Sequence, residues 1–338
     1  MKKIKVGLMG FGEIARHFYK QCLKDDLIDV VAISDIAQPD ILCYLLLSET
    51  KNEIDVHLEG NYLISGNRKA RIFQGSHPTQ IPWDAFDVDF VLDSTRKFLY
   101  RKNMEAHLRS GAKRVILSTL PKDDIDRIAI MGVNDDSIRR TDKLISPGSS
   151  TTNAAALMIK TLDEAFGVEY AITTTIHSYT ADQPLRNLAG ENFRRSRSAV
   201  TNIIPNTSPT PDGVSKVMPE FRNKIIGSAL NVPVHAGSLL DLTTIIEKDG
   251  LTMNDVHAAI EKKAKETPKI VSVAYDPIVS SDIFEDYHSA VYDRNATILL
   301  DNRMLKTITW YHTTLAMAVR IKEIIIKYVN LDKKGGLS

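Results

Sequence analysis

The first 35 residues limit the fold more than any other part of the chain. An apolar run at residues 4–9 leads into the turn GFGEIA at residues 10–15. An amphipathic segment follows, and a second apolar run ends at Asp35. Strand, glycine-rich turn, helix and strand in this order predict one unit of a parallel sheet. Gly10 permits the tight turn, and Gly12 lets the backbone approach a pyrophosphate. The predicted dinucleotide contacts in this turn are Gly10, Phe11, Gly12 and Ile14.

Asp35 makes the prediction of a dinucleotide site more specific. It ends the second predicted strand about 20 residues after the turn, where a carboxylate can bind ribose hydroxyls. A carboxylate there repels a 2′-phosphate, so NAD is expected and NADP is less favoured. Glu13 opposes an anionic ligand at this turn, although an acid in the first turn of a helix also stabilises the helix dipole. The alternative is a glycine turn that holds no ligand.

Strand and helix signals continue to alternate up to about residue 150. Strands are expected at residues 87–95 and 112–121, with a helix at 101–111 between them and further short strands at 127–134 and 143–150. Residues 36–86 look less regular. Near-continuous apolar strands separated by helices are typical of a doubly wound, parallel α/β sheet.

The pattern changes after residue 150. A helix is expected at residues 151–166, a β-branched strand at 168–180 and a second helix at 253–266, with longer antiparallel strands elsewhere. Residues 181–202 are too irregular to form an element. This half is therefore expected to be α+β, and the tail 330–338 is expected to be frayed.

Composition excludes several classes of protein. The 338 residues suffice for two domains, and 43 basic against 42 acidic residues argue against a nucleic-acid binder. No apolar run is long enough to cross a bilayer, and the first predicted strand leaves no room for a signal peptide. Only Cys22 and Cys43 occur, in no metal-binding pattern. We therefore expect a cytoplasmic protein without a metal site.

The turn before the 151–166 helix carries a second cluster of polar side chains. Pro147 and Gly148 break the chain, and Ser149, Ser150 and Thr151 follow directly. A helix start has amide groups without intrahelical partners and the positive end of the helix dipole. Such a turn can bind an anion, activate a nucleophile or simply cap the helix.

Several segments, taken in order, resemble the glyceraldehyde-3-phosphate dehydrogenase family. They are VGLMGFGEIAR, GAKRVILS, SSTTNAAALMIKTLDEAFGVEYAITTTIHSYTADQ, RSRSAVTNIIPNTSP, KVMPEF, NVPVHAGSLLDLT, PIVSSDI and LKTITWY. The resemblance implies a Rossmann-type dinucleotide-binding domain at 1–149 and a catalytic domain at 150–314. A C-terminal helix at about 315–332 would return to the first domain. It also implies a small-molecule substrate and a homotetramer with an interface loop near 178–203.

The resemblance also implies roles for individual residues. Ser150 stands where the family has the cysteine that attacks the aldehyde, and His177 matches the family base. One anion site of the family corresponds to Ser149, Thr151, Arg197 and Ser208, and the other corresponds to Thr180, Asp182 and Asn231. Asp182 replaces a threonine and Asn231 an arginine, which should weaken phosphate binding. Further cofactor contacts are expected at Ser94, Thr95, Ser118 and Thr313, of which Thr313 replaces a carboxamide-binding asparagine.

The serine at position 150 leaves several functions open. A hydroxyl loses its proton far less readily than a thiol, so ordinary phosphorylating activity is not expected. The chain could transfer hydride without a covalent intermediate, with His177 as base. It could instead be an inactive homologue that binds a nucleotide or metabolite, or a cysteine-to-serine variant of an active enzyme. A serine–histidine hydrolase is less favoured, because the sequence identifies no orienting acid or oxyanion hole.

Overall fold

The chain divides into two compact units. The computed structural model describes residues 3–51 and 53–334. The first unit comprises residues 1–129, 136–148 and 317–338, and the second comprises residues 130–135 and 149–316. Among the described residues, no helix is both long enough and apolar enough to span a bilayer.

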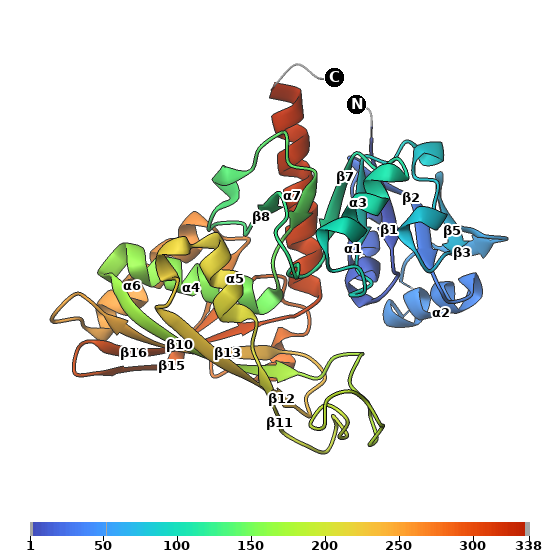
Figure 1. Ribbon diagram of the computed structural model, residues 1–338. Helices are drawn as coiled ribbons and strands as arrows, with labels where there is room; N and C mark the ends of the chain where they lie inside the picture. The colour runs from blue at the N-terminus through green and yellow to red at the C-terminus, as the bar shows by residue number, and fades with distance from the viewer. Residues whose placement is uncertain (1–2, 52, 335–338) are drawn as a thin grey trace. The chain divides into compact units, whose positions relative to one another are not determined.

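The first unit is built on a nine-stranded, largely parallel sheet in the order β3-β4-β5-β2-β1-β6-β7-β9-β8. Its strands are β1 (Ile4–Met9), β2 (Ile28–Asp35), β3 (His57–Glu59), β4 (Tyr62–Ser65), β5 (Arg68–Gln74), β6 (Phe90–Asp93), β7 (Arg114–Leu117), β8 (Arg127–Ile128) and β9 (Leu144–Ser146). Within the described part of this sheet, the β3–β4 and β4–β5 pairs are antiparallel and the other pairs are parallel. The helices are α1 (Glu13–Leu23), α2 (Pro39–Glu49) and α3 (Arg101–Arg109) (Figure 1).

The strand order places a ligand-binding crevice beside β1. From β1 the chain builds outward through β2 and β5 on one side and through β6, β7 and β9 on the other. Open α/β sheets bind ligands at the carboxyl ends of the strands where the order reverses in this way. Gly10 follows β1 and Ser94 follows β6, so the two turns meet at this point.

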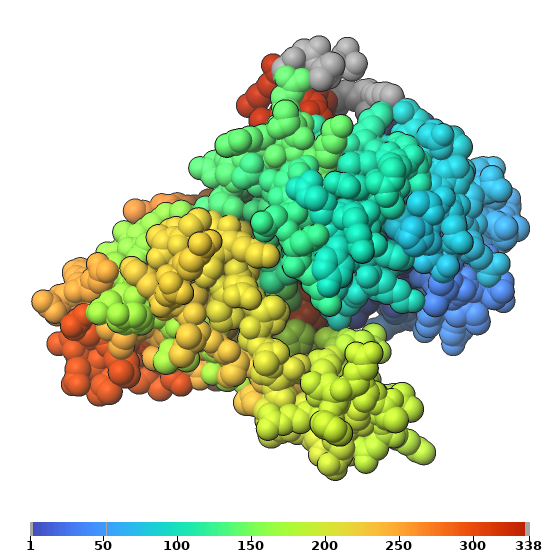
Figure 2. Space-filling model, viewed as in Figure 1, coloured from blue at the N-terminus to red at the C-terminus, as the bar shows by residue number. Residues whose placement is uncertain are grey.

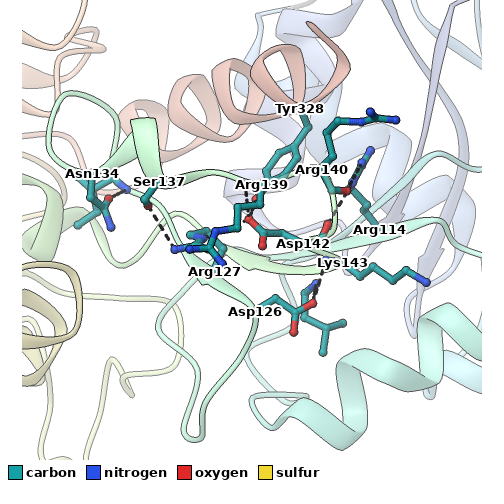
Figure 3. Close-up of polar contacts among 12 residues, drawn as sticks. Arg114, Asp126, Arg127, Asn134, Ser137, Arg139, Arg140, Asp142, Lys143 and Tyr328 are labelled. Atoms are coloured by element: carbon teal, nitrogen blue, oxygen red, sulfur yellow. Dashed lines mark hydrogen bonds and ion pairs between the residues drawn. The ribbon is translucent and has the colours of Figure 1, made fainter. Parts of the chain in front are cut away.

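The last helix, α7 (Leu315–Lys334), belongs to the first unit from Met317 onward. The Tyr328 hydroxyl donates to Asp142 Oδ2 at 2.9 Å, and the Arg114 guanidinium binds both carboxylate oxygens of Asp332 at 2.6 and 2.9 Å. Asp142 Oδ2 also accepts from Arg127 Nε and from the Arg139 amide (Figure 3). These bonds attach α7 to the segment before β9.

The second unit is a seven-stranded mixed sheet in the order β11-β12-β10-β13-β16-β15-β14. Its strands are β10 (Val168–Ser178), β11 (Ile204–Thr207), β12 (Ile225–Val232), β13 (Ser238–Ile246), β14 (Val271–Ala274), β15 (Ala290–Leu300) and β16 (Met304–Tyr311). Three helices cover one face: α4 (Ser150–Phe166), α5 (Thr210–Val217) and α6 (Met253–Glu266) (Figure 1). The expected α/β fold with a second α+β part is therefore confirmed.

Three local predictions are wrong, and one helix is not among the predicted elements. Residues 36–86 are not irregular: they contain α2, β3, β4 and β5. The structure also has α5, which was not expected. The chain stays helical through Lys334, so residues 330–334 are not frayed, and residues 335–338 lie outside the described part. The strand expected at 127–134 is only the two residues of β8.

Candidate active site

The glycine turn and Asp35 form a candidate nucleotide site within the first unit. The Phe11 amide donates to Asp35 Oδ2 at 2.7 Å, and the Ala37 amide donates to Oδ1 at 3.0 Å. Gly10 has a φ of +82°, and a Cβ there would lie 3.1 Å from Thr95 Cγ2. The Ser94 hydroxyl donates to the Gly10 carbonyl at 2.9 Å. The turns after β1 and β6 are thus in direct contact and joined by a hydrogen bond.

These turns enclose a cavity of about 220 Å³. Its lining includes the predicted contacts Gly10, Gly12, Asp35, Ser94 and Thr95. Gly12 is the N-cap of α1 without a side-chain cap, and a Cβ on it would enter open space. A larger side chain there would therefore project into the cavity. The open helix start and the carboxylate fit the pyrophosphate and ribose of a dinucleotide.

The other predicted cofactor residues lie outside this lining. Phe11 is buried with its ring against Tyr19, and Ile14 lies on α1. The buried Ser118 follows β7, and its amide donates to the Asp93 carbonyl at 2.9 Å. Thr313 belongs to the second unit. The lining also contains residues that the sequence did not predict, which lie in or after different strands and share no local motif: Met9, Ser34, Ile36, Gly75, Ser76, Lys97 and Phe98.

A second group of predicted residues lies at the start of α4, in the second unit. Ser149 is the N-cap, and its Oγ accepts from the Thr152 amide at 3.1 Å. Ser150 is the first helical residue and is half-buried. The Thr151 hydroxyl contacts the buried Tyr311 hydroxyl at 2.7 Å. Burial raises the pKa of the Tyr311 phenol well above its usual range, so this hydroxyl keeps its proton.

His177 lies near the carboxyl end of β10, with a defined ring orientation. Its Nδ1 is 2.6 Å from the Ser178 carbonyl oxygen, which can only accept, so Nδ1 carries the proton. In the neutral ring, Nε2 is then the nitrogen that can take a proton. The Ser178 amide donates to Ser238 Oγ at 3.1 Å, and Ser238 also bonds Tyr311. This hydrogen-bonded chain brings His177 and the start of α4 to one end of the unit.

Two predicted substrate residues flank this end. Asn231 is the register partner of His177 on the parallel strand β12, so both side chains lie on the same face. Asn231 is buried and accepts from Asn206 Nδ2 at 3.4 Å. Thr180 Oγ1 donates to Asp182 Oδ1 at 2.6 Å.

The charge of Asp182 is not isolated. Arg195 forms an ion pair with it, from the segment that precedes β11. Arg195 was not selected from the sequence as a substrate contact. Arg197, which was, is exposed and bonds Asn187 at 3.4 Å. Ser208 lies before α5, where its Oγ accepts from the Thr210 amide at 3.3 Å.

Comparisons with known proteins identify the family. Residues 4–101 match the glyceraldehyde 3-phosphate dehydrogenase NAD binding domain, and residues 149–313 match the C-terminal domain. This chain belongs to the glyceraldehyde-3-phosphate dehydrogenase family. The dehydrogenase of Mycobacterium avium is 36% identical over 333 residues, covering 95% of this chain and 97% of its own. The dehydrogenase of Priestia megaterium is 34% identical, with the same coverage of the two chains. That of Borreliella burgdorferi is 34% identical, covering 96% of this chain and all of its own.

The match to the NAD binding domain covers the cavity of the first unit. The cavity, the glycine turn and Asp35 all lie within residues 4–101, the range of the NAD-binding domain. Ser149, Ser150 and His177 lie within the range of the C-terminal domain. The two groups of predicted residues thus fall within the two family domains, one in each.

Proposed function

We propose that this protein is an NAD-dependent oxidoreductase that transfers hydride to or from a small aldehyde or alcohol without a cysteine thioester. Its dinucleotide-binding domain would span residues 1–149 with the helix at about 315–332, and its substrate domain residues 150–314. The observation that carries the proposal is that His177 keeps its proton on Nδ1, in a unit whose helix α4 begins with a serine and not a thiol. Phosphorylating activity is expected to be very low.

The preference for NAD over NADP rests on Asp35. Two backbone amides hold its carboxylate at the cavity wall, so the charge cannot turn away from a nucleotide. A 2′-phosphate would be placed beside this charge and would be repelled. When bound, the nicotinamide accepts or returns the hydride.

The residues of the second unit would handle the proton. In the oxidation of an alcohol, Nε2 of His177 takes the hydroxyl proton as the hydride leaves the carbon, and a carbonyl results. In the reverse direction the same nitrogen returns the proton to the developing alkoxide. Ser150 would donate a hydrogen bond to the reacting oxygen. No bond to serine forms in either direction.

The polar groups near His177 indicate the substrate class. Asn231 offers an amide where the family resemblance places an arginine, and Arg195 is already paired with Asp182. The Asn231 amide and the Asp182–Arg195 ion pair, whose charges cancel, can hydrogen-bond hydroxyl or amino groups but offer little attraction to a phosphate dianion. We therefore propose a polar, hydroxylated or amino-bearing substrate.

We also propose that the protein is a cytoplasmic homotetramer. The face of the second sheet opposite its helices exposes the apolar side chains Tyr170, Ile172, Ile226, Ile298, Leu300 and Met304. The segment 181–202 projects from this unit (yellow-green in Figure 2) and exposes Leu185, Leu188 and Phe193. Exposed apolar clusters of this kind favour association between copies.

Calorimetry and a metabolite screen test the proposal. NAD should bind more tightly than NADP, and a panel of aldehydes and polyols should reveal turnover through the absorbance of reduced nicotinamide. His177→Ala should abolish that turnover, whereas Ser150→Ala should only reduce it. Absence of heat with either nucleotide contradicts the proposal. Nucleotide binding without turnover of any substrate would support a regulatory homologue instead, which the missing thiol also favours.

A further inference from the structure

Three buried side chains are hydrogen-bonded in a row that ends at Thr95, a residue that lines the cavity. Trp83 precedes a short 3-10 helix, His107 lies on α3, and Asp93 ends β6. All three are fully buried. Trp83 Nε1 is 3.1 Å from His107 Nδ1, and His107 Nε2 is 3.1 Å from Asp93 Oδ2. Segments far apart in the sequence therefore meet in one line of hydrogen bonds.

The direction of each bond in this chain follows from its members. An indole nitrogen can only donate, so His107 Nδ1 must accept from Trp83. In the neutral ring the proton is then on Nε2, which donates to Asp93. The imidazole thus has one orientation and one tautomer that satisfy both neighbours.

The second oxygen of Asp93 holds the turn that lines the cavity. Asp93 Oδ1 accepts from the Thr95 amide at 3.0 Å and from the Thr95 hydroxyl at 2.7 Å. Thr95 Oγ1 in turn accepts from the Lys97 amide at 3.1 Å. Ser94, Thr95 and Lys97 all line the cavity. A displacement of the Asp93 carboxylate would therefore move the cavity wall.

Trp83, at the other end of this row of hydrogen bonds, packs against β1. A Cβ added at Gly7 would lie 2.6 Å from the Trp83 ring, so the indole packs directly on the strand that leads to the glycine turn. Thr95 has little room, because its Cγ2 would lie 3.1 Å from a Cβ at Gly10. The chain from Trp83 to Thr95 thus connects both turns that face the cavity.

We propose that His107 is a positioning residue for dinucleotide binding, although it does not line the cavity. Its Nε2–H bond holds the Asp93 carboxylate, and Asp93 holds the Ser94–Lys97 turn in the geometry that a nucleotide phosphate or ribose contacts. The inference rests on the nucleotide binding proposed above. A purely structural histidine would support the fold without setting nucleotide affinity.

Two conservative variants separate these roles. His107→Gln keeps a donor near the Nε2 position for Asp93 but loses the acceptor for Trp83. His107→Asn keeps an acceptor near the Nδ1 position but loses the donor. Each removes one buried hydrogen bond, so both should lower the unfolding temperature. Only His107→Asn should weaken NAD binding strongly, by roughly ten- to a hundred-fold, the usual effect of losing a hydrogen bond to a charged group. His107→Gln should stay within about threefold of the unsubstituted protein.

A buried histidine in the other unit supplies the matched control. His257 Nδ1 lies 2.9 Å from the Tyr292 hydroxyl, within the second unit. His257→Gln should lower the unfolding temperature and leave NAD affinity unchanged. NAD titrations by calorimetry and thermal unfolding on the same samples give both quantities.

The possible results distinguish a failure of the positioning role of His107 from a failure of the proposed NAD binding. Equal NAD affinity in the two His107 variants, or affinities that follow their unfolding temperatures, would overturn the positioning role while leaving nucleotide binding intact. Failure of the unsubstituted protein to bind NAD would overturn the proposed function, and this inference with it. If His107→Asn loses NAD affinity while His107→Gln keeps it, the positioning role of His107 is supported.

Discussion

Single hydrogen bonds decide which chemistry the side chains can perform. A carbonyl oxygen next to His177 fixes its proton on Nδ1, which leaves Nε2 for the role of base in the proposed reaction. Two amides fix Asp35 at the cavity wall. Arg195 compensates Asp182, a contact between two loops that local sequence patterns do not encode. These contacts are the ones on which the proposed hydride transfer and the proposed substrate class depend.

Asp35→Asn should weaken NAD binding and reduce discrimination against NADP. Asparagine replaces one acceptor by an amide group, which must face either the Phe11 or the Ala37 amide as a second donor. We expect roughly a tenfold loss of NAD affinity, with a smaller loss for NADP. Calorimetric titration with both nucleotides measures this. Asp40→Asn, on the exposed start of α2, is the control. An unchanged ratio of affinities would argue against the assigned role of Asp35.

Ser150→Cys should create a reactive thiol without creating an efficient phosphorylating enzyme. A thiol at a helix start near a histidine ionises readily, so iodoacetamide should modify position 150 quickly. Burial raises the pKa of the Cys22 and Cys43 thiols, so both should react slowly. Turnover of glyceraldehyde 3-phosphate should stay low, because Asn231 offers no guanidinium to a phosphate.

The reactivity of this thiol needs its own control. Mass spectrometry of alkylated peptides measures it, with Ser48→Cys, near the exposed end of α2, as the comparison. Full phosphorylating activity in Ser150→Cys would show that the substrate groups are intact and that our interpretation of Asn231 is wrong.

Helices and strands were predictable where one face is apolar. The periodicity of 151–166 matches α4, which begins one residue earlier, at Ser150. Helix α2 was missed because apolar side chains cover it on two sides: Leu42 and Leu46 point inward, while Ile41 and Tyr44 are exposed. Such a helix has no amphipathic stripe for a sequence pattern to reveal. In the candidate site, Gly10, Gly12 and Asp35 could be found from a local motif, whereas Lys97 and Arg195 depend on tertiary contacts.

Asp126→Asn should destabilise the first unit in a pH-dependent way. Asp126 accepts from the Lys143 amide (Figure 3), from the Leu144 amide and from Arg101. Partial burial would raise the pKa of this carboxyl, but the hydrogen bonds outweigh burial and hold it below its ordinary value of 3.8. A lowered native pKa stabilises the fold above the ordinary value, and this contribution is lost as pH falls through the native value.

The substitution should therefore cost about 1–3 kcal/mol near neutral pH. Urea unfolding of both proteins between about pH 6 and pH 3 measures their free energies of unfolding. The difference between the two should become smaller toward the acid end. Asp124→Asn, close by in the sequence, is the control. A difference that stays constant down to about pH 3 would show that the charge of Asp126 does not stabilise the fold.

At the scale of the whole molecule, the two units have different surfaces. The sheet of the first unit is largely parallel, which requires cover on both faces. The sheet of the second unit has helices on one face and exposed isoleucines on the other. An uncovered apolar face of this kind is typical of an interface, which supports assembly through the second unit.

Charge placed on this face should therefore break the assembly. Ile172 and Ile226 are register partners on β10 and β12, and both are exposed. The double variant Ile172→Glu with Ile226→Glu puts like charges side by side on each copy, and burying them in an interface would be costly. Light scattering after gel filtration should show a tetramer for the unsubstituted protein and smaller species for the variant. Lys262→Glu, on the exposed side of α6, should leave the tetramer intact. If the unsubstituted protein elutes as a single chain, the tetramer proposal fails. If the double variant stays tetrameric, copies must associate through another surface.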